Sequence, residues 1–399
     1  MSDQVQRRGG TTAQHAAFTG ALRETTIDTD KKTVVVHDGV LAGGYPLMRQ
    51  DLSNATNTGT GNNVRSDSAV LTGSITAPFV RGEFRKDAPS AVAFIATSTF
   101  AVSTATQMYI DINGTCYTFA SGIVSVMPAA VTGADYAIYA CTDGTIRSDS
   151  NFSAPTGYTT TNSRKIGGFH YAAGANAAAQ AGGNTIPTIN SYSFWDLKFK
   201  PACQDPRGMT LVAGNFWADI YLTNTDPDTN GTSKYNLNIA DGASPPKVPT
   251  KFGGNGTTTY TTYTWWEANE VLAANGKRSA SYQEYAALAF GTTEASAIGT
   301  DQVSTILNSV YTSKWGVMQA TGVMWVWGKD FGGGAAAAGW VANTTGRGQT
   351  YQLPNAGLFG GYWAGGALAG SCCSSWDNSP TVSNNVVGGR GVVDHLLLD

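Results

Sequence analysis

WWEANEVLAANGKRSASYQEYAALAFG, at residues 265–291, carries two helix signals that follow one another directly. Over Trp265–Asn275 the apolar residues recur at helical spacing, and the next residue is a glycine, a residue type that commonly ends helices. Ser281 and Glu284 then have the spacing of a capping box, and Gly291 closes the apolar run that follows. The stretch therefore predicts two helices.

The sequence around these helices differs in composition from the rest of the chain. Nine of the ten tryptophans lie between Trp217 and Trp376, and Gly-rich stretches alternate there with short apolar runs such as Val323–Trp327. Two helices among many tryptophans and short strand-like runs are typical of a compact α+β domain. We assign this domain to residues 189–399.

Residues 51–188 show a different pattern, in which short β-type runs are separated by turn residues. They open with a polar, Gly/Asn/Thr-rich stretch at 51–68, which we interpret as a linker. Asn113-Gly114, between the runs Met108–Ile112 and Cys116–Phe119, is a strong signal for a two-residue hairpin. Regular short strands of this kind predict a β-sandwich.

Residues 1–50 are too few to bury a core of their own. Thr25–Ile27 and Thr33–His37 are β-rich runs joined by a polar turn, so we predict a small module built from strands. Units below about 70 residues usually need disulfides, a structural metal or oligomerisation to be stable. Because this stretch contains no cysteine, we expect several chains to assemble here.

Composition excludes several classes of function. Of the 399 residues only 13% are charged, the formal net charge is -3, and no cluster of Lys or Arg exceeds a pair. Nucleic-acid binding driven by phosphate neutralisation is therefore not expected. No apolar run approaches the ~20 residues that cross a bilayer, and the first residues show no secretory signal, so we expect synthesis in the cytoplasm without membrane insertion.

Cysteine and metal-site patterns are sparse. The five cysteines include no C-x-x-C pair, so we expect free thiols and no structural zinc. The stretch from Asp226 to Gly231 imitates the start of an EF-hand loop. Leu237 stands where the bidentate Glu would be, so we interpret the stretch as a polar turn. No metal and no cofactor are implied.

RGGTTAQHAAFTGALRETTIDTDKKTVVVHDG, at residues 8–39, is a long and specific string. Others are DPRGMTLV at 205–212, FWADI at 216–220, GKR at 276–278, FGG at 359–361, Trp363, Gly370-Ser371 and GRGVVDHL at 389–396. These strings resemble the major tropism determinants of phages. The resemblance covers nearly the whole chain and is weakest at 51–90 and 222–265.

The resemblance implies a multidomain, mainly β protein with an α+β C-terminal domain. Residues 1–50 would form a β-prism that holds a homotrimer, residues 51–188 an intermediate β-sandwich, and residues 189–399 a C-type-lectin-like fold. It also implies a place in the virion at the tip of a tail fibre, contact with other tail-fibre proteins, and binding to a host bacterial surface receptor, protein or glycan. It implies no enzyme activity.

In that family a diversity-generating retroelement varies part of the lectin fold, here residues 359–389. The pattern marks ten receptor-binding positions as hypervariable: Tyr362, Ala364, Gly365, Leu368, Ser375, Asp377, Asn378, Val382, Asn384 and Val386. Retroelement diversification turns Asn codons into any codon that ends in C, and such codons reach each of these amino acids. They do not reach Trp, Lys, Glu, Gln or Met, and the last four are absent from residues 359–389.

A varied face needs a backbone that does not depend on the varied side chains. Trp363, Trp376 and Pro380, with the glycines around them, could supply that support. The ten side chains offer one aromatic, one carboxylate and otherwise small or aliphatic groups, which suits a contact not driven by charge. Tyr362 is the expected hot spot. By composition alone, the segment would be a Gly/Asn/Ser-rich loop without a role.

Two other functions stay open on the sequence. The C-terminal domain resembles, more distantly, the formylglycine-generating oxidases, whose chemistry needs reactive cysteines; Cys372 and Cys373 lie in the variable segment. Asp394-His395 could be half of a catalytic pair, although a polar pair at a strand end is the more common arrangement. The chain could also be a purely structural fibre protein.

Overall fold

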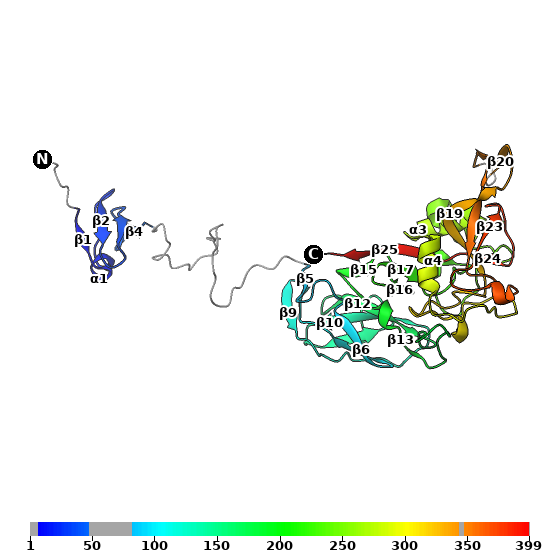
Figure 1. Ribbon diagram of the computed structural model, residues 1–399. Helices are drawn as coiled ribbons and strands as arrows, with labels where there is room; N and C mark the ends of the chain where they lie inside the picture. Colours follow the sequence, from blue (N-terminus) through cyan, green and yellow to red (C-terminus); the bar gives the residue numbers. More distant parts are fainter. Residues whose placement is uncertain (1–6, 48–81, 343–346, 399) are drawn as a thin grey trace. The chain divides into compact units, whose positions relative to one another are not determined.

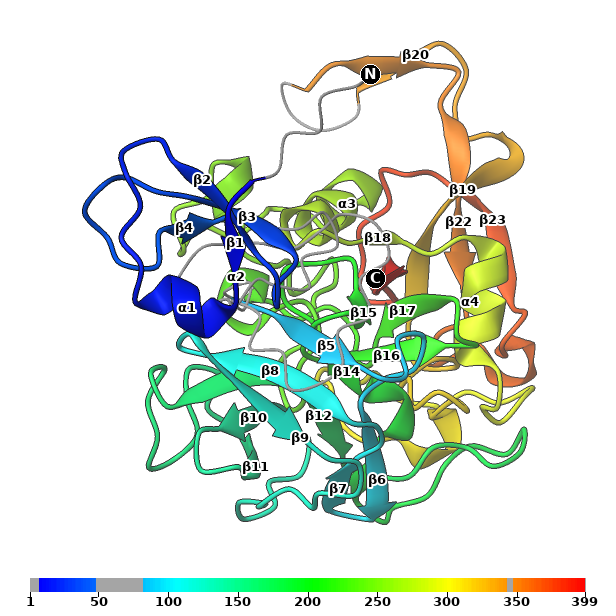
Figure 2. The ribbon, with the colours of Figure 1, turned by 90° about the vertical axis from the view of Figure 1, so that its left-hand side faces the viewer.

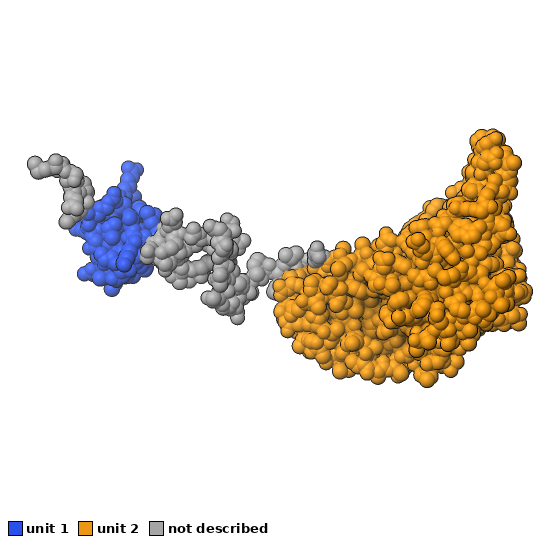
Figure 3. Space-filling view, in the orientation of Figure 1, with its two compact units in different colours: residues 1–77 blue, residues 78–399 orange. Residues whose placement is uncertain are grey.

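The computed structural model describes residues 7–47, 82–342 and 347–398. The chain forms two compact units, residues 1–77 and residues 78–399, shown in Figures 1 and 3. The polar stretch at 51–68 lies outside the described residues. Among the helices of the described part, none is long and apolar enough to cross a membrane.

Unit 1 is one small sheet with a short helix. The strands are ordered β1-β2-β3-β4 in the sheet, and the helix α1 follows β1 in the chain. The elements are β1 (Gly9–Gly10), α1 (Thr12–Ala16), β2 (Thr25–Asp28), β3 (Thr33–Val36) and β4 (Tyr45–Pro46). The hairpin β2–β3 is the one predicted from the sequence, with Asp28 paired to Thr33. The helix α1 was not predicted, although Thr11 and Gln14 form a capping box at its start.

The first half of unit 2 holds three small sheets, ordered β5-β8-β9, β6-β7 and β11-β10-β12-β13, with β14 paired to β12. The strands are β5 (Phe84–Lys86), β6 (Phe94–Ser98), β7 (Ala101–Thr104), β8 (Met108–Ile112), β9 (Thr115–Phe119), β10 (Asp135–Cys141), β11 (Ile146–Asp149), β12 (Ser163–Ala172), β13 (Thr188–Ile189) and β14 (Trp195–Asp196). Asn113 and Gly114 both have positive φ and join β8 to β9, so the predicted hairpin is confirmed.

A single hydrophobic cluster lies between these sheets. It combines Met108 and Ile110 of β8 with Tyr136 and Ile138 of β10, all at most 1% exposed. The period-2 alternation of apolar residues therefore turns both sheets toward one core.

The second half of unit 2 begins with the sheet β15-β25-β17-β16, in which β18 also pairs with β25. Its strands are β15 (Phe199–Pro201), β16 (Met209–Val212), β17 (Phe216–Asp219), β18 (Arg278–Ser279) and β25 (Gly391–Leu397). The last strand of the chain thus lies between β15 and β17, which are about 180 residues earlier in the sequence. Trp217, Met209 and Val393 pack with Trp195 of the first half, which joins the two halves through buried side chains.

Both helices predicted from residues 265–291 are confirmed. They are α3 (Trp265–Ala274), followed by Gly276 at φ 70, and α4 (Tyr282–Ala289), whose cap residue Ser281 accepts a hydrogen bond from the Glu284 amide. The shorter helical turns are η1 (Ser191–Ser193), α2 (Pro227–Asn230), η2 (Thr250–Phe252), η3 (Ser309–Tyr311) and η4 (Gly366–Leu368).

A second sheet, ordered β23-β22-β19-β24, packs against α4 and also contacts a core that includes residues of α3. It consists of β19 (Trp325–Ala335), β22 (Pro354–Phe359), β23 (Ser374–Asn378) and β24 (Val387–Gly388). Beyond it, β20 (Trp340–Ala342) and β21 (Gln349–Tyr351) form a hairpin that stands out from unit 2 in Figures 1 and 2.

The structure is mainly β with the two longest helices in its C-terminal part, as predicted. The finer assignment of a prism, a sandwich and a lectin fold, with boundaries at residues 50 and 188, is not decided by these elements and is taken up below.

Candidate functional site

Residues 359–389 leave the second sheet at one strand and return to it at another. They begin at the end of β22, add β23 at one edge of the sheet, and end in β24 at the other edge. In Figure 1 this orange-to-red segment surrounds the end of unit 2 that carries β23 and β24. Its path is thus tied to the sheet at three strands.

Two glycines force the turn at which the segment begins. Gly360 and Gly361 have φ values of 91° and 81°, in the left-handed region that side chains with a Cβ rarely adopt. A Cβ on Gly360 would lie 2.6 Å from the Tyr285 hydroxyl, and one on Gly361 would lie 2.6 Å from the Ala369 Cβ. Both the backbone angle and the packing therefore require the FGG string.

Side chains from outside the segment hold its backbone in place. The Glu294 carboxylate accepts hydrogen bonds from the amide and the hydroxyl of Ser371, at 2.9 and 2.6 Å. Asp301 accepts one from the Asn385 side chain at 2.8 Å. These anchors do not involve any of the ten positions predicted to vary.

Arg390 fixes the chain immediately after the segment. Its side chain is 1% exposed, and its guanidinium donates to the carbonyls of Asp219, Ile220, Met318 and Gln319 at 2.7–3.1 Å. Burial lowers the pKa of Arg390, but four carbonyl acceptors surround the cation. The residue ties β17 and the loop before β19 to the end of the variable segment.

The predicted framework residues support the segment from inside. Trp376 packs edge-on against Phe359 and Tyr282, and its indole N–H donates to Ser374 at 3.0 Å. The Trp363 amide donates to Val323 O, and Pro380 is buried with its carbonyl accepting from the Trp265 amide. All three make contacts that do not use the ten predicted side chains.

None of the ten predicted positions is buried. Ala364, Leu368, Asp377 and Asn384 are exposed, and Tyr362, Gly365, Ser375, Asn378, Val382 and Val386 are partly exposed. Leu368, in η4, is 82% exposed. The structure brings six of them into two groups. Asn384 borders the second group, because its side chain accepts a hydrogen bond from the Val386 amide at 3.2 Å.

The first group lies on β23. The Ser375 hydroxyl donates to Asp377 at 2.5 Å, and the Asn378 amide donates to Ser375 and Asp377, both at 2.8 Å. Such a network presents one carboxylate with several hydrogen-bonding partners.

The second group surrounds a residue that the sequence analysis did not single out. Trp325, at the start of β19, stacks with Tyr362 at 6.3 Å between ring centroids and an angle of 22°. Val382 and Val386 pack at the margin of the same hydrophobic cluster as Trp325. The apolar run Val323–Trp327 was the available signal, but nothing in it distinguishes Trp325 from its buried neighbours.

Both groups face the same side of the sheet. Ser375 pairs with Leu358, and Leu358 pairs with Trp327, so these three side chains share a face. Trp325 is two residues before Trp327 in the same strand and therefore points the same way. Leu358 and Trp327, between the two groups, are each 1% exposed in the core shared with α3, so this face of the sheet is covered between them.

The β20–β21 hairpin is a further surface feature that the sequence did not predict. Trp340 and Tyr351 contact each other edge-on at 5.3 Å and are 68% and 57% exposed. Arg347 forms an ion pair with Glu270 of α3, which links the hairpin to the body of unit 2.

The other candidate groups do not form a catalytic site. Cys372 is exposed and Cys373 half-buried, both are free thiols, and burial raises the pKa of Cys373, which is the opposite of nucleophile activation. Asp394 bonds to Arg278 at 2.8 Å, whereas the His395 Nδ1 accepts from the Trp217 indole at 2.9 Å, so the two side chains serve different partners. Burial also lowers the pKa of His395.

Asp226 and the residues after it serve as a turn and helix start in this structure. Asp226 precedes α2 and pairs with Lys247 at 2.6 Å, and Asp228 accepts from the Thr250 amide at 2.7 Å.

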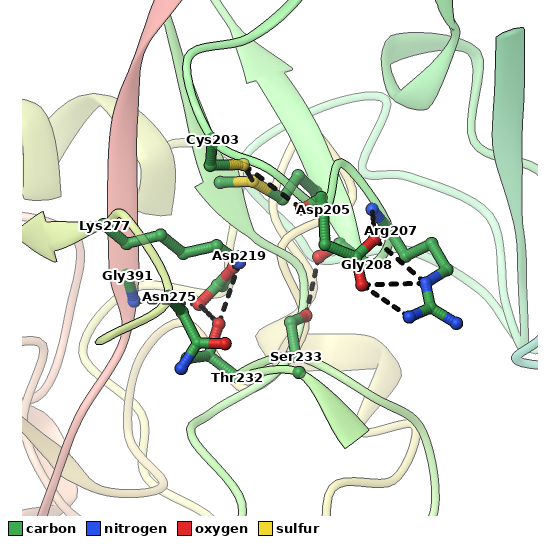
Figure 4. Close-up of polar contacts among 12 residues, drawn as sticks. Cys203, Asp205, Arg207, Gly208, Asp219, Thr232, Ser233, Asn275, Lys277 and Gly391 are labelled. Atoms are coloured by element: carbon green, nitrogen blue, oxygen red, sulfur yellow. Dashed lines mark hydrogen bonds and ion pairs between the residues drawn. The ribbon is translucent and has the colours of Figure 1, made fainter. Parts of the chain in front are cut away.

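A cavity of about 740 Å³ lies away from the variable segment. Its lining includes Phe152 and Lys165 of the first half and Arg207, Lys251 and Asn275 of the second, and no residue of 359–389. Figure 4 shows part of its wall, where Arg207 is held by Asp205, beside the buried pair Lys277–Asp219. The charged groups there already have partners, so the cavity shows no site of its own.

Comparison with known proteins agrees with this architecture. The family descriptions "Major tropism determinant N-terminal domain" and "Mtd second domain" match residues 5–41 and 86–196. The tail fiber receptor-binding protein of Bordetella phage BPP-1 is 52% identical over 408 residues, which covers 100% of both chains. Solved structures of the Major Tropism Determinant M1 and U1 variants are each 51% identical with a TM-score of 0.79, and the match covers 99% of this chain and 100% of theirs. The chain therefore belongs to the major tropism determinant family of phage tail-fibre receptor-binding proteins.

Proposed function

We propose that this chain attaches its phage to a host bacterium through the side chains that residues 359–389 display, and that a retroelement varies ten of them. The proposal rests on one observation: the residues that hold the backbone of the segment are not the residues that are predicted to vary. Its backbone is held by Gly360, Gly361, Glu294, Asp301 and Arg390, and none of the ten predicted side chains is buried. A face built in this way can change its side chains without losing its shape.

We further infer that residues 1–50 form a β-prism, 51–188 a β-sandwich and 189–399 a C-type-lectin-like fold. Three small sheets around one core support the sandwich. A sheet that begins and ends near the domain's termini, two helices and a long segment looping from a second sheet support the lectin fold. Buried contacts of Ala172 and Ala173 with Ile220, Tyr221 and Met318 join the last two domains into one compact unit.

The homotrimer is supported by the surface of unit 1. Leu22, Val40 and Tyr45 are 69%, 83% and 55% exposed, which is a large apolar surface for so small a module. Assembly through unit 1 would cover it and place several copies of the variable face at the tip of a tail fibre, attached to other fibre proteins of the virion. Several weakly binding faces held together can then attach strongly, because binding of the first face raises the effective concentration of the others at the receptor surface.

An exchange of segments tests the receptor-binding role. Residues 359–389 are replaced by the corresponding segment of the Bordetella phage BPP-1 relative, and binding of the full-length chimera to a panel of Bordetella strains is measured. We expect the chimera to acquire the strain preference of the relative. A chimera that keeps the preference of its parent would place receptor binding outside residues 359–389, and a parent that binds none of the strains selectively would favour a purely structural fibre protein.

The retroelement has its own test in the gene. A near-copy of the gene's 3′ end that lies close by and differs chiefly at adenines would identify the template. Differences spread evenly over all four bases would contradict diversification by this route.

The oxidase alternative is disfavoured by Cys373. Burial raises the pKa of that thiol, whereas a reactive cysteine needs a lowered one.

A further inference from the structure

Strand β19 runs between the two limbs of the variable segment. Val323 pairs with Tyr362 on one side, and the Trp325 amide donates to Val386 O at 2.9 Å on the other. Trp325 also pairs with Val387 in the parallel register of β19 and β24. A residue outside the segment is therefore placed in its middle by backbone hydrogen bonds, which do not change when side chains vary.

The Trp325 side chain reaches the surface at this position. Its ring is partly exposed, whereas Val326 and Trp327, which follow it, are buried at 0% and 1% exposure. One side of its environment is the Tyr362 ring, stacked at 6.3 Å, and Val382 and Val386 pack into the same cluster. Trp325 and three predicted variable residues thus form one apolar patch, with Trp325 as its fixed member.

We propose that Trp325 is an invariant receptor contact, an inference that rests on the proposed function. Trp325 is the fixed member of an aromatic pair, and Tyr362 is the member that can be exchanged. Codons that end in C can place Tyr or Phe at the ten positions but never Trp, the residue type most enriched in binding hot spots. A tryptophan encoded outside the segment supplies what diversification cannot.

The patch fits an apolar side chain of a protein receptor. Residues 359–389 contain no Lys, Arg or Glu and one Asp, so the face offers little to a charged partner. Leu368 adds an aliphatic side chain that is 82% exposed. Aromatic and aliphatic side chains form the apolar centre of a typical protein interface, and Asn384, which accepts from the Val386 amide, adds a polar group beside them.

A selection with a defined protein probe tests the proposal. Full-length chains with the ten positions randomised to codons ending in C are selected on immobilised serum albumin. Independent binders are then remade with Trp325→Ala, Trp325→Phe or, as a control, Phe252→Ala, and their Kd values are measured. Phe252, in η2, is also an exposed aromatic at 41% but lies outside the variable segment.

Loss of a central aromatic contact weakens binding about tenfold or more. We expect that loss for Trp325→Ala in most binders, a smaller one for Trp325→Phe, and none for Phe252→Ala, with unchanged unfolding midpoints. Trp325→Ala binders that keep their Kd would overturn the role of Trp325 and leave the variable face intact. A folded library without binders would instead refute the proposed face itself.

Discussion

Arg390 shows at the level of one residue how the variable segment is held. Its guanidinium donates to four backbone carbonyls from two separate loops, and its side chain has no carboxylate partner in the described structure. The residue thus acts as a connector between main-chain segments. Because carbonyls are present whatever the neighbouring side chains are, this connector is independent of the variation beside it.

Removal of this connector should be costly. Arg390→Met leaves buried carbonyls without donors, and each such group costs about 1–3 kcal/mol. We expect the free energy of unfolding, measured by urea denaturation, to fall by about 3 kcal/mol or more. Arg85→Met is the matched control, because Arg85 is exposed and its guanidinium lies over the Tyr109 ring at 4.2 Å. Equal losses in the two variants would contradict the role given to Arg390.

The roles of some residues could be predicted from the sequence, whereas the role of Trp325 could not. Trp363 and Trp376 were predicted as framework from the family pattern; both are partly exposed, with Trp376 bonded to Ser374 and Trp363 edge-on to Tyr362. Trp325 was not singled out, because its exposure depends on where β24 and Tyr362 lie, and both are distant in sequence. Composition cannot tell a buried tryptophan from one at a surface when the deciding neighbours are not local.

Among the elements, α4 carries a pH-sensitive cap. Burial raises the pKa of Glu284, but hydrogen bonds from Arg278 and from Ser281 outweigh it and hold the pKa below its ordinary value of 4.5. A carboxylate with a lowered folded-state pKa stabilises the fold above its unfolded pKa, and this contribution is lost as the pH falls through the folded-state value.

Glu284→Gln should therefore be less stable than the parent at pH 7, by about 1–2 kcal/mol for the lost charged hydrogen bonds. As the pH falls below 4.5 and through the lowered folded-state pKa, the difference should shrink, because the parent then protonates Glu284 as well. Thermal unfolding followed by circular dichroism over this pH range measures it. As a control, Ser281→Ala removes the hydroxyl cap but keeps the ion pair between Glu284 and Arg278, so its stability should retain most of the acid dependence. If Glu284→Gln remains less stable than the parent by the same amount in acid, the mechanism is wrong.

Local signals predicted the elements that local interactions form. The caps at Ser281 and Gly276 and the turn at Asn113-Gly114 are short-range features, and α3, α4 and the β8–β9 hairpin are where they predict. β19 extends to Ala335 through three consecutive glycines, a sequence with low β propensity, because β22 pairs with it. A strand that forms through its partner leaves no signal in its own residues.

The whole molecule combines a stiff display unit with a small module that has apolar residues on its surface. The family resemblance covered nearly the whole chain, but it did not predict that the first and second halves of unit 2 pack into one unit. That joint depends on Ala172 and Ala173 meeting Ile220, Tyr221 and Met318 in one buried cluster. Contacts between chain segments so far apart have no local pattern.

The exposed apolar residues of unit 1 predict that one charged substitution there changes the oligomeric state of the protein. Val40→Glu places a charge on a residue that is 83% exposed in the isolated chain and covered in the proposed trimer. A buried, unpaired charge costs several kcal/mol per site, so we expect trimers to dissociate, with light scattering after size exclusion showing the mass of one chain. Val303→Glu, at a site 66% exposed on unit 2, should leave the trimer intact. A parent chain that is already a monomer of 41.7 kDa would remove the basis for cooperation among the variable faces.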